Sequence, residues 1–226
     1  MAVDPGNDTQ LENPQSWNKY AYVENNPIKY LDPNGEFKIV GSHRHQNITR
    51  NASTQAAHVS QRDVVQGNSR ADTSRWRNSD DSAHLNEGGA TGSATDTRVQ
   101  AGADQLGSAL RSLAGGNAEA AGEALGGSQH SFQDLVGHGG VDGDQHDAQS
   151  VDSSGSAGFG IREVGATDLT STINGIFNDA AAAIQAGGDV DAIVGGAQAA
   201  ATQAAQGAYN DTKAKLEAAG QKPEGY

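Results

Sequence analysis

The stretch that decides the fold covers residues 101–138 and reads AGADQLGSALRSLAGGNAEAAGEALGGSQHSFQDLVGH. Its large apolar residues recur every three or four positions, at Leu106, Leu110 and Leu113, which is the spacing of one helix face. The run Gly115-Gly116-Asn117 interrupts that face and predicts two helices between Ala101 and about Leu125. A third helix is predicted from about Ser128 to the glycines at 139–140, since paired glycines end helices.

The flanking segments extend the helical pattern in both directions. A helix is predicted over 46–61, and another from about Leu169 to Ala186, with Thr167 or Asp168 as its N-cap. After the glycine pair at 187–188, Asp189 could cap a long alanine-rich helix that continues to about Ala219. Residues 59–100 are rich in Ser, Asp, Asn, Arg and Gly and are expected to be mostly a polar loop region, at about 60–100.

The composition supports a helical protein and excludes several functions. Hydrophobic residues make up 35% of the 226 residues and aromatic residues 5%, so a large aromatic-rich β-sandwich is not expected. The chain has no Cys, which excludes disulfides and cysteine-based zinc sites. A net charge of -13 argues against tight binding to duplex nucleic acid, which needs a basic surface. No apolar run approaches the ~20 residues of a membrane span, and no signal peptide is visible.

Histidines are the most informative residues, and the densest group is HSFQDLVGH. His130, Asp134 and His138 follow one another at intervals of four, which places them on one face of a helix. His130 and Asp134 could chelate one ion across a single turn. His138 lies about 12 Å along the axis from His130 and would reach a second ion unless the helix bends at Gly137. The alternative is a solvent-facing pair at i,i+4.

Further histidines and carboxylates extend the set of candidate ligands. His43 and His45 precede the helix predicted over 46–61, and they could also belong to a solvated basic turn. Asp80, Asp81 and His84 lie in a polar segment that could either supply two metal ligands or be a simple linker. His146 and Asp147 follow the third helix. His58 is expected to be structural or exposed.

The N-terminal stretch 11–35, LENPQSWNKYAYVENNPIKYLDPNG, contains two turn signals and a short strand-like run around Tyr22. It resembles the C-terminal end of the core of RHS-repeat (rearrangement hotspot) proteins, in which a similar "NLYAYVxNNPxxxxDPxG" motif closes a large β-cocoon. Pro27, Asp32, Pro33 and Gly35 match that motif. The resemblance implies that residues 1–37 are a β-hairpin-like leader from the carrier and that residues 38–226 are the toxin domain, delivered into a target cell.

A second resemblance concerns the histidines. The stretch 116–140, GNAEAAGEALGGSQHSFQDLVGHGG, resembles the "LGxALHxxQDxxxH" helix of the zinc-dependent phospholipase C-like superfamily, and SHRHQNITRNA at 42–52 resembles its "GHxxITxxAL" start. The resemblance implies a mainly α multi-helix domain that binds one to three zinc ions or other divalent metals. It implies metal ligands at His43, His45, Asp81, His84, His130, Asp134, His138 and His146.

These resemblances imply a metal-dependent hydrolase that cleaves the phosphodiester of phospholipids, with Asp80, Asp81 or Asp147 as the general base. The expected partners are a phospholipid membrane as substrate, the RHS cocoon and a cognate immunity protein, with no stable nucleic-acid complex. Two alternatives remain at this point. One is a metal-dependent nuclease toxin, and the other is a non-enzymatic, membrane-disrupting helical toxin in which the histidines are incidental.

Overall fold

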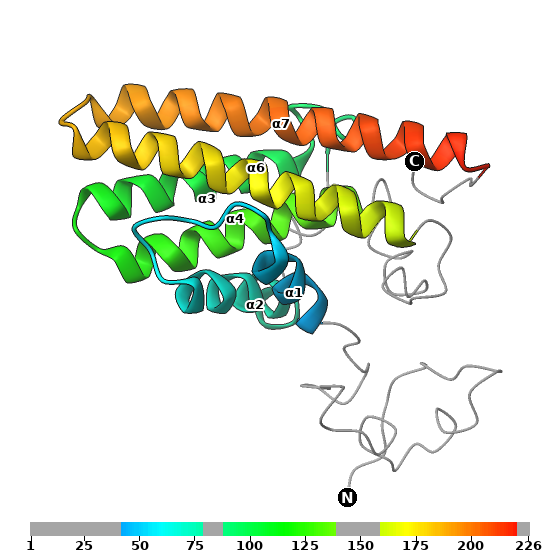
Figure 1. The fold of residues 1–226 in the computed structure, drawn as a ribbon, viewed down its shortest axis with the longest axis horizontal. Helices are drawn as coiled ribbons and strands as arrows, with labels where there is room; N and C mark the ends of the chain where they lie inside the picture. Colours follow the sequence, from blue (N-terminus) through cyan, green and yellow to red (C-terminus); the bar gives the residue numbers. More distant parts are fainter. Residues whose placement is uncertain (1–41, 79–87, 139–158, 221–226) are drawn as a thin grey trace, which may run out of the picture. The chain divides into compact units, whose positions relative to one another are not determined.

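The computed structural model describes residues 42–78, 88–138 and 159–220. Over these ranges the protein is built from helices and contains no strand, so the prediction of a mainly α fold is confirmed there (Figure 1). The leader predicted over 1–37 lies outside the described residues. The helices are α1 (Ser42–Asn51), α2 (Gln61–Asn78), α3 (Thr97–Ala114), α4 (Ala118–His138), α6 (Phe159–Gln185) and α7 (Val190–Ala218).

Helix α4 is the central element of the bundle. It packs against α2, α3, α6 and α7, and every residue from Leu125 to Val136 is buried. A helix that is buried around its whole circumference is normally apolar all round. Half of this segment is polar instead, with buried side chains at Ser128, Gln129, His130, Ser131, Gln133 and Asp134. Buried polar groups are costly unless they are paired, so the surrounding helices have to supply partners.

The apolar part of the core lies where α4 meets α3, α6 and α7. Leu106 and Leu110 of α3 are fully buried there, together with Phe132 of α4 and Ile173 and Phe177 of α6. Helix α7 closes this core with a seam of mostly small residues, at Val194, Ala197, Ala201, Ala205, Tyr209, Thr212 and Leu216. The seam recurs every three or four residues, as expected for one buried helix face. The N-cap predicted at Asp189 is confirmed, because its side chain accepts a hydrogen bond from the Ala192 amide.

On the other side of α4, helix α2 approaches so closely that glycine is required. A Cβ placed on Gly126 of α4 would overlap the backbone of Val64 and Asn68, and a Cβ on Gly67 of α2 would overlap the backbone of Glu123. Small residues on facing helices allow their backbones to come together. This close contact brings the inner face of α2 to the polar face of α4.

Four predicted boundaries differ from the structure, and three of them lie after residue 59. The region expected to be a polar loop at about 60–100 contains α2 over most of its first half. The break expected between Leu125 and Ser128 does not occur, because α4 continues through the glycine pair that allows α2 to approach. Helix α6 begins at Phe159, so Thr167 and Asp168 lie inside it rather than at its N-cap.

The helix predicted over 46–61 is also shorter than expected, since α1 ends at Asn51. The segment that follows lies along α6, whose side chains satisfy its backbone. Ser171 Oγ accepts from the amide of Ser53 at 2.9 Å, and Asn174 Nδ2 donates to the carbonyl of Thr54 at 2.8 Å. Asn178 bonds both the Ala57 amide and the Gln55 carbonyl, at 2.6 and 2.9 Å. These long-range bonds replace the helical ones.

Candidate metal centre

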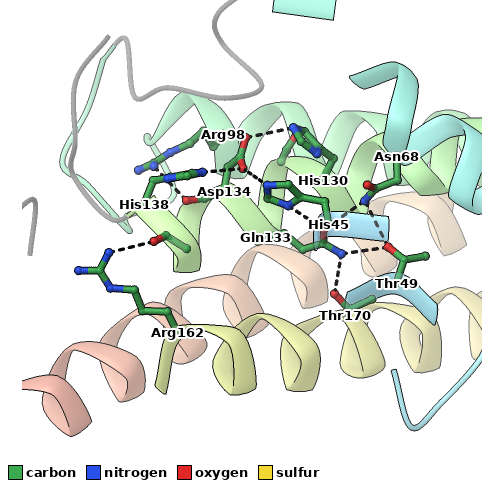
Figure 2. A network of polar contacts seen from close by, with 12 residues as sticks. His45, Thr49, Asn68, Arg98, His130, Gln133, Asp134, His138, Arg162 and Thr170 are labelled. Atoms are coloured by element: carbon green, nitrogen blue, oxygen red, sulfur yellow. Dashed lines mark hydrogen bonds and ion pairs between the residues drawn. The ribbon is translucent and has the colours of Figure 1, made fainter. Parts of the chain in front are cut away.

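Three imidazoles converge on one buried carboxylate at the polar face of α4 (Figure 2). His130 Nε2 lies 3.1 Å from Asp134 Oδ2, and His138 Nε2 lies 3.2 Å from Asp134 Oδ1. The two histidines, one turn before and one turn after Asp134, therefore meet opposite oxygens of the same carboxylate. Both histidine side chains and that of Asp134 are 1–3% exposed, so the solvent-facing alternative for this motif is wrong.

The third imidazole comes from α1. His45 Nε2 lies 3.2 Å from Asp134 Oδ1, the oxygen that also meets His138. The rings of His45 and His130 are close, with centroids 4.5 Å apart. His45, Asp134 and His138 form a group whose ligand atoms all lie within 4.8 Å of one another, and this group could hold a metal ion.

A second group with the same potential combines His45 with Asp72 of α2 and His130. Because the two groups share His45, they describe one contiguous set of side chains, which we call the His–Asp cluster: His45, Asp72, His130, Asp134 and His138. Oδ2 of Asp72 is buried and receives no hydrogen bond from any of the described residues. A buried carboxylate oxygen without a donor is costly, and a bound cation would satisfy it.

The spacing of the donor atoms allows either direct hydrogen bonds or a shared ion. Charge-assisted N–H···O bonds are typically about 2.7–2.9 Å long. Two ligand atoms of a tetrahedral zinc ion, each about 2.0–2.1 Å from the metal, are separated by about 3.3–3.4 Å. The 3.1–3.2 Å separations at Asp134 lie between these values, within the range of about 2.7–3.2 Å for N–H···O hydrogen bonds. The donor atoms are thus close enough together to share a small cation.

Asp134 is the negative centre of this cluster. Burial alone would raise the pKa of its carboxyl, but His130 and His45 counteract burial by their charge, and hydrogen bonds from His130 and His138 add to their effect. The resulting pKa lies well below the ordinary value of 3.8. Asp134 is therefore ionised at neutral pH, as a metal ligand has to be.

Two arginines fix the last turn of α4, which carries His138. Arg98 is fully buried, forms an ion pair with Asp96 at 2.8 Å, and donates to the carbonyl of Asp134 at 3.5 Å. Arg162 of α6 donates to the carbonyl of Gly137 at 3.2 Å. The carbonyl of Gly137 lies in the last turn of α4, where carbonyls have no partner within the helix, so the bond from Arg162 satisfies it and helps to hold the position from which His138 reaches Asp134.

The structure brings together four of the predicted metal ligands, namely His45, His130, Asp134 and His138. His43 lies in α1, and its side chain is outside the description. The remaining candidates fall outside the described residues: Asp80, Asp81, His84, His146 and Asp147. His58, expected to be structural or exposed, is exposed, and its Nδ1 lies 3.1 Å from Gln185 Nε2.

Sequence reasoning missed Asp72, which lies in the region that was expected to be a loop. The sequence does contain a helical signal here, because Val64, Asn68 and Asp72 recur every four residues. Two of the three are polar, however, so they do not form the apolar stripe by which a helix is recognised. A groove of about 680 Å³ between α1 and α2 is lined by Arg50, Arg62 and Arg70 among others and by none of the cluster residues.

Comparison of the chain with protein-family models, with curated proteins and with solved structures found no match.

Proposed function

We propose that the His–Asp cluster is a zinc centre and that the domain is a metal-dependent phosphodiesterase acting on phospholipids. The observation that carries the proposal is the convergence of three imidazole Nε2 atoms on the buried, ionised carboxylate of Asp134. Imidazole nitrogen and carboxylate oxygen are the donors that zinc takes in catalytic sites, and a three-ligand group leaves a position for water or substrate.

A bound zinc ion would polarise a phosphodiester and lower the pKa of its water to about 7. His45, Asp134 and His138 would hold the ion, and His130 and Asp72 would hold a second one or orient the first set. A carboxylate outside the ligand set is needed to accept the proton of the attacking water. Asp80, Asp81 and Asp147 remain the candidates for this general base.

The choice of phospholipid as substrate rests on the resemblance of 116–140 to the phospholipase C-like helix, together with the net charge of -13. That charge opposes the close approach of a nucleic-acid backbone. None of the described helices is long and apolar enough to cross a bilayer. Delivery by an RHS carrier and neutralisation by an immunity protein are part of the proposal and rest on the motif at 11–35.

The test is a hydrolysis screen with purified protein of known metal content. Zinc-loaded protein should release phosphorylated headgroups from phospholipid vesicles and leave RNA and DNA intact, and His130→Ala should abolish this release. The matched control is His58→Asn, which changes an exposed histidine at a positive φ of 68° to a residue that tolerates that conformation. Nucleic-acid cleavage by the metal-loaded protein would favour a nuclease, and toxicity retained by His130→Ala would favour membrane disruption.

A further inference from the structure

His45 is held from both sides of its ring. Nε2 faces Asp134 Oδ1 at 3.2 Å, and Nδ1 lies 3.0 Å from Gln133 Oε1 (Figure 2). A neutral imidazole carries one N–H and one lone pair, so which nitrogen is the donor decides which nitrogen can ligate a metal. The surrounding hydrogen bonds determine which nitrogen of His45 is the donor, because each bond in a connected chain of amides and hydroxyls fixes the donor and the acceptor of the next bond.

The chain starts at a backbone carbonyl, which can only accept. Asn174 Nδ2 donates to the carbonyl of Thr54 at 2.8 Å, so the Oδ1 of Asn174 accepts from Gln129 Nε2 at 2.6 Å. Gln129 Oε1 is then the acceptor that faces Thr49 Oγ1 at 3.0 Å. The single hydroxyl proton of Thr49 is used in this bond, and its oxygen can only accept from other neighbours.

The side-chain amide of Gln133 is oriented by two such hydroxyls. Its Nε2 donates to Thr49 Oγ1 and to Thr170 Oγ1, both at 3.1 Å. The hydroxyl of Thr170 donates its proton to the carbonyl of Ala166 at 2.8 Å, so Thr170 Oγ1 can only accept from Gln133. Both protons of the Gln133 amide are therefore committed. Its Oε1 has to be the atom that faces His45.

Asn68 of α2 supports the same orientation. Its Nδ2 donates to Gln133 Oε1 at 3.1 Å and to Thr49 Oγ1 at 3.2 Å. Asn68 Oδ1 is buried and receives no hydrogen bond from the described residues. Rotating the amide would place Asn68 Oδ1 against the acceptors Thr49 Oγ1 and Gln133 Oε1 and would break both hydrogen bonds. The observed orientation leaves one oxygen unsatisfied but keeps both bonds.

We propose that this chain of hydrogen bonds makes Gln133 the positioning residue of the metal centre: it fixes the N–H of His45 on Nδ1 and leaves the Nε2 lone pair directed at the cation. Nδ1 of His45 faces the acceptor Gln133 Oε1, and Nε2 faces the acceptor Asp134 Oδ1. When the N–H is on Nδ1, Nε2 therefore needs a second proton or a cation between it and Asp134. The inference rests on the proposed metal centre, but it concerns which atom binds the metal and not what the metal hydrolyses. Hydrogen bonds to the distal nitrogen of a ligating histidine are a recurrent way of setting ligand orientation and basicity.

The experiment uses the full chain loaded with an NMR-active cadmium isotope and carrying nitrogen-labelled histidine. We expect scalar coupling between cadmium and Nε2 of His45, and a proton on Nδ1. Coupling through Nδ1, or failure of the chain to bind cadmium or zinc, would overturn the inference. This measurement uses the unaltered protein and does not depend on how well any variant folds.

A variant pair then tests Gln133 directly. Gln133→Met keeps the length of the side chain and removes the acceptor, and we expect its zinc affinity to fall about 10–100-fold. The control is Gln198→Met on α7, whose amide donates to the carbonyl of Ala103 at 3.1 Å, away from the cluster; it should bind zinc like the wild type. Equal zinc affinity in Gln133→Met and the wild type would refute the positioning role. If cadmium couples to Nε2 of His45 but the zinc-loaded protein hydrolyses no phospholipid, this inference is upheld and the proposed hydrolase function is refuted.

Discussion

Replacing Asp134 by asparagine removes the one negative charge on which three imidazoles converge while keeping the shape of the side chain. Asp134 is 1% exposed, and its oxygens lie 3.1–3.2 Å from the Nε2 atoms of His45, His130 and His138. Removing one partner of a buried charged contact typically costs about 3–5 kcal/mol. For a chain of this size, about 1 kcal/mol corresponds to roughly 2–4 °C in Tm. We therefore expect the zinc-loaded protein to lose about 6–20 °C in Tm.

The assay is thermal unfolding followed by far-ultraviolet circular dichroism, with metal per chain measured by mass spectrometry on the same samples. Asp134→Asn should lose the metal as well as the stability. The matched control is Asp211→Asn in α7, where the same substitution removes an ion pair at the same i,i+4 spacing, but one that is 53–60% exposed. Exposed pairs contribute at most about 1 kcal/mol. A Tm for Asp134→Asn as high as that of the control, with the metal retained, would refute the view that Asp134 is the centre of the site.

Three further outcomes are expected. The folded-state pKa of Asp134 lies well below 3.8, so its ionised form stabilises the fold above about pH 4, and this contribution is lost as the pH falls through the lowered value. Protons compete with zinc for its ligands, so zinc should dissociate on acidification before Asp134 is protonated, and metal content and Tm measured against pH should separate the two steps. Gly126→Ala should cost about 1–3 kcal/mol in urea unfolding and loosen zinc, because its Cβ would push α2 away from α4, whereas Gly175→Ala, with open space at its Cβ, should not be destabilised. Deletion of residues 1–37 should leave both metal content and Tm unchanged, and a loss of either would show that the leader contributes to the domain.

The sequence predicts the apolar part of this fold better than the polar part. The leucines of α3 and the cap of α7 are visible in the sequence because apolar spacing and capping are local properties. The segment after α1 has the same helical spacing, at Ala52, Ala56 and Val59, yet it is not helical. Its backbone bonds to side chains of α6 more than a hundred residues away, and no local pattern reports such partners.

The same distinction explains which parts of the candidate site could be anticipated. His130, Asp134 and His138 are found by spacing, because one helix carries all three at intervals of four. Asp72 and Gln133 could not be found in this way: Asp72 lies in a helix that is packed through glycine contacts instead of large apolar residues. Gln133 differs from a structural glutamine only through the direction of its hydrogen bonds, which depends on partners from α1, α2 and α6.

The two sides of α4 are held by different forces, and this difference bears on the function of the cluster. Towards α3, α6 and α7 lies the apolar core, whose burial supplies stability, while Gln129 and Gln133 also bond to Asn174 and Thr170 of α6. Towards α1, few apolar side chains are available, chiefly Ile48 and Ala52, and the helix is fixed by His45 and Thr49 through polar contacts. Each hydrogen bond contributes little net stability, but it forms only within a narrow range of distance and angle and so fixes the positions of its partners. A domain that needed only to be stable would gain more from an apolar face at this contact, and the polar face of α4 instead holds His45 and Asp134 in the fixed arrangement that the proposed metal centre needs.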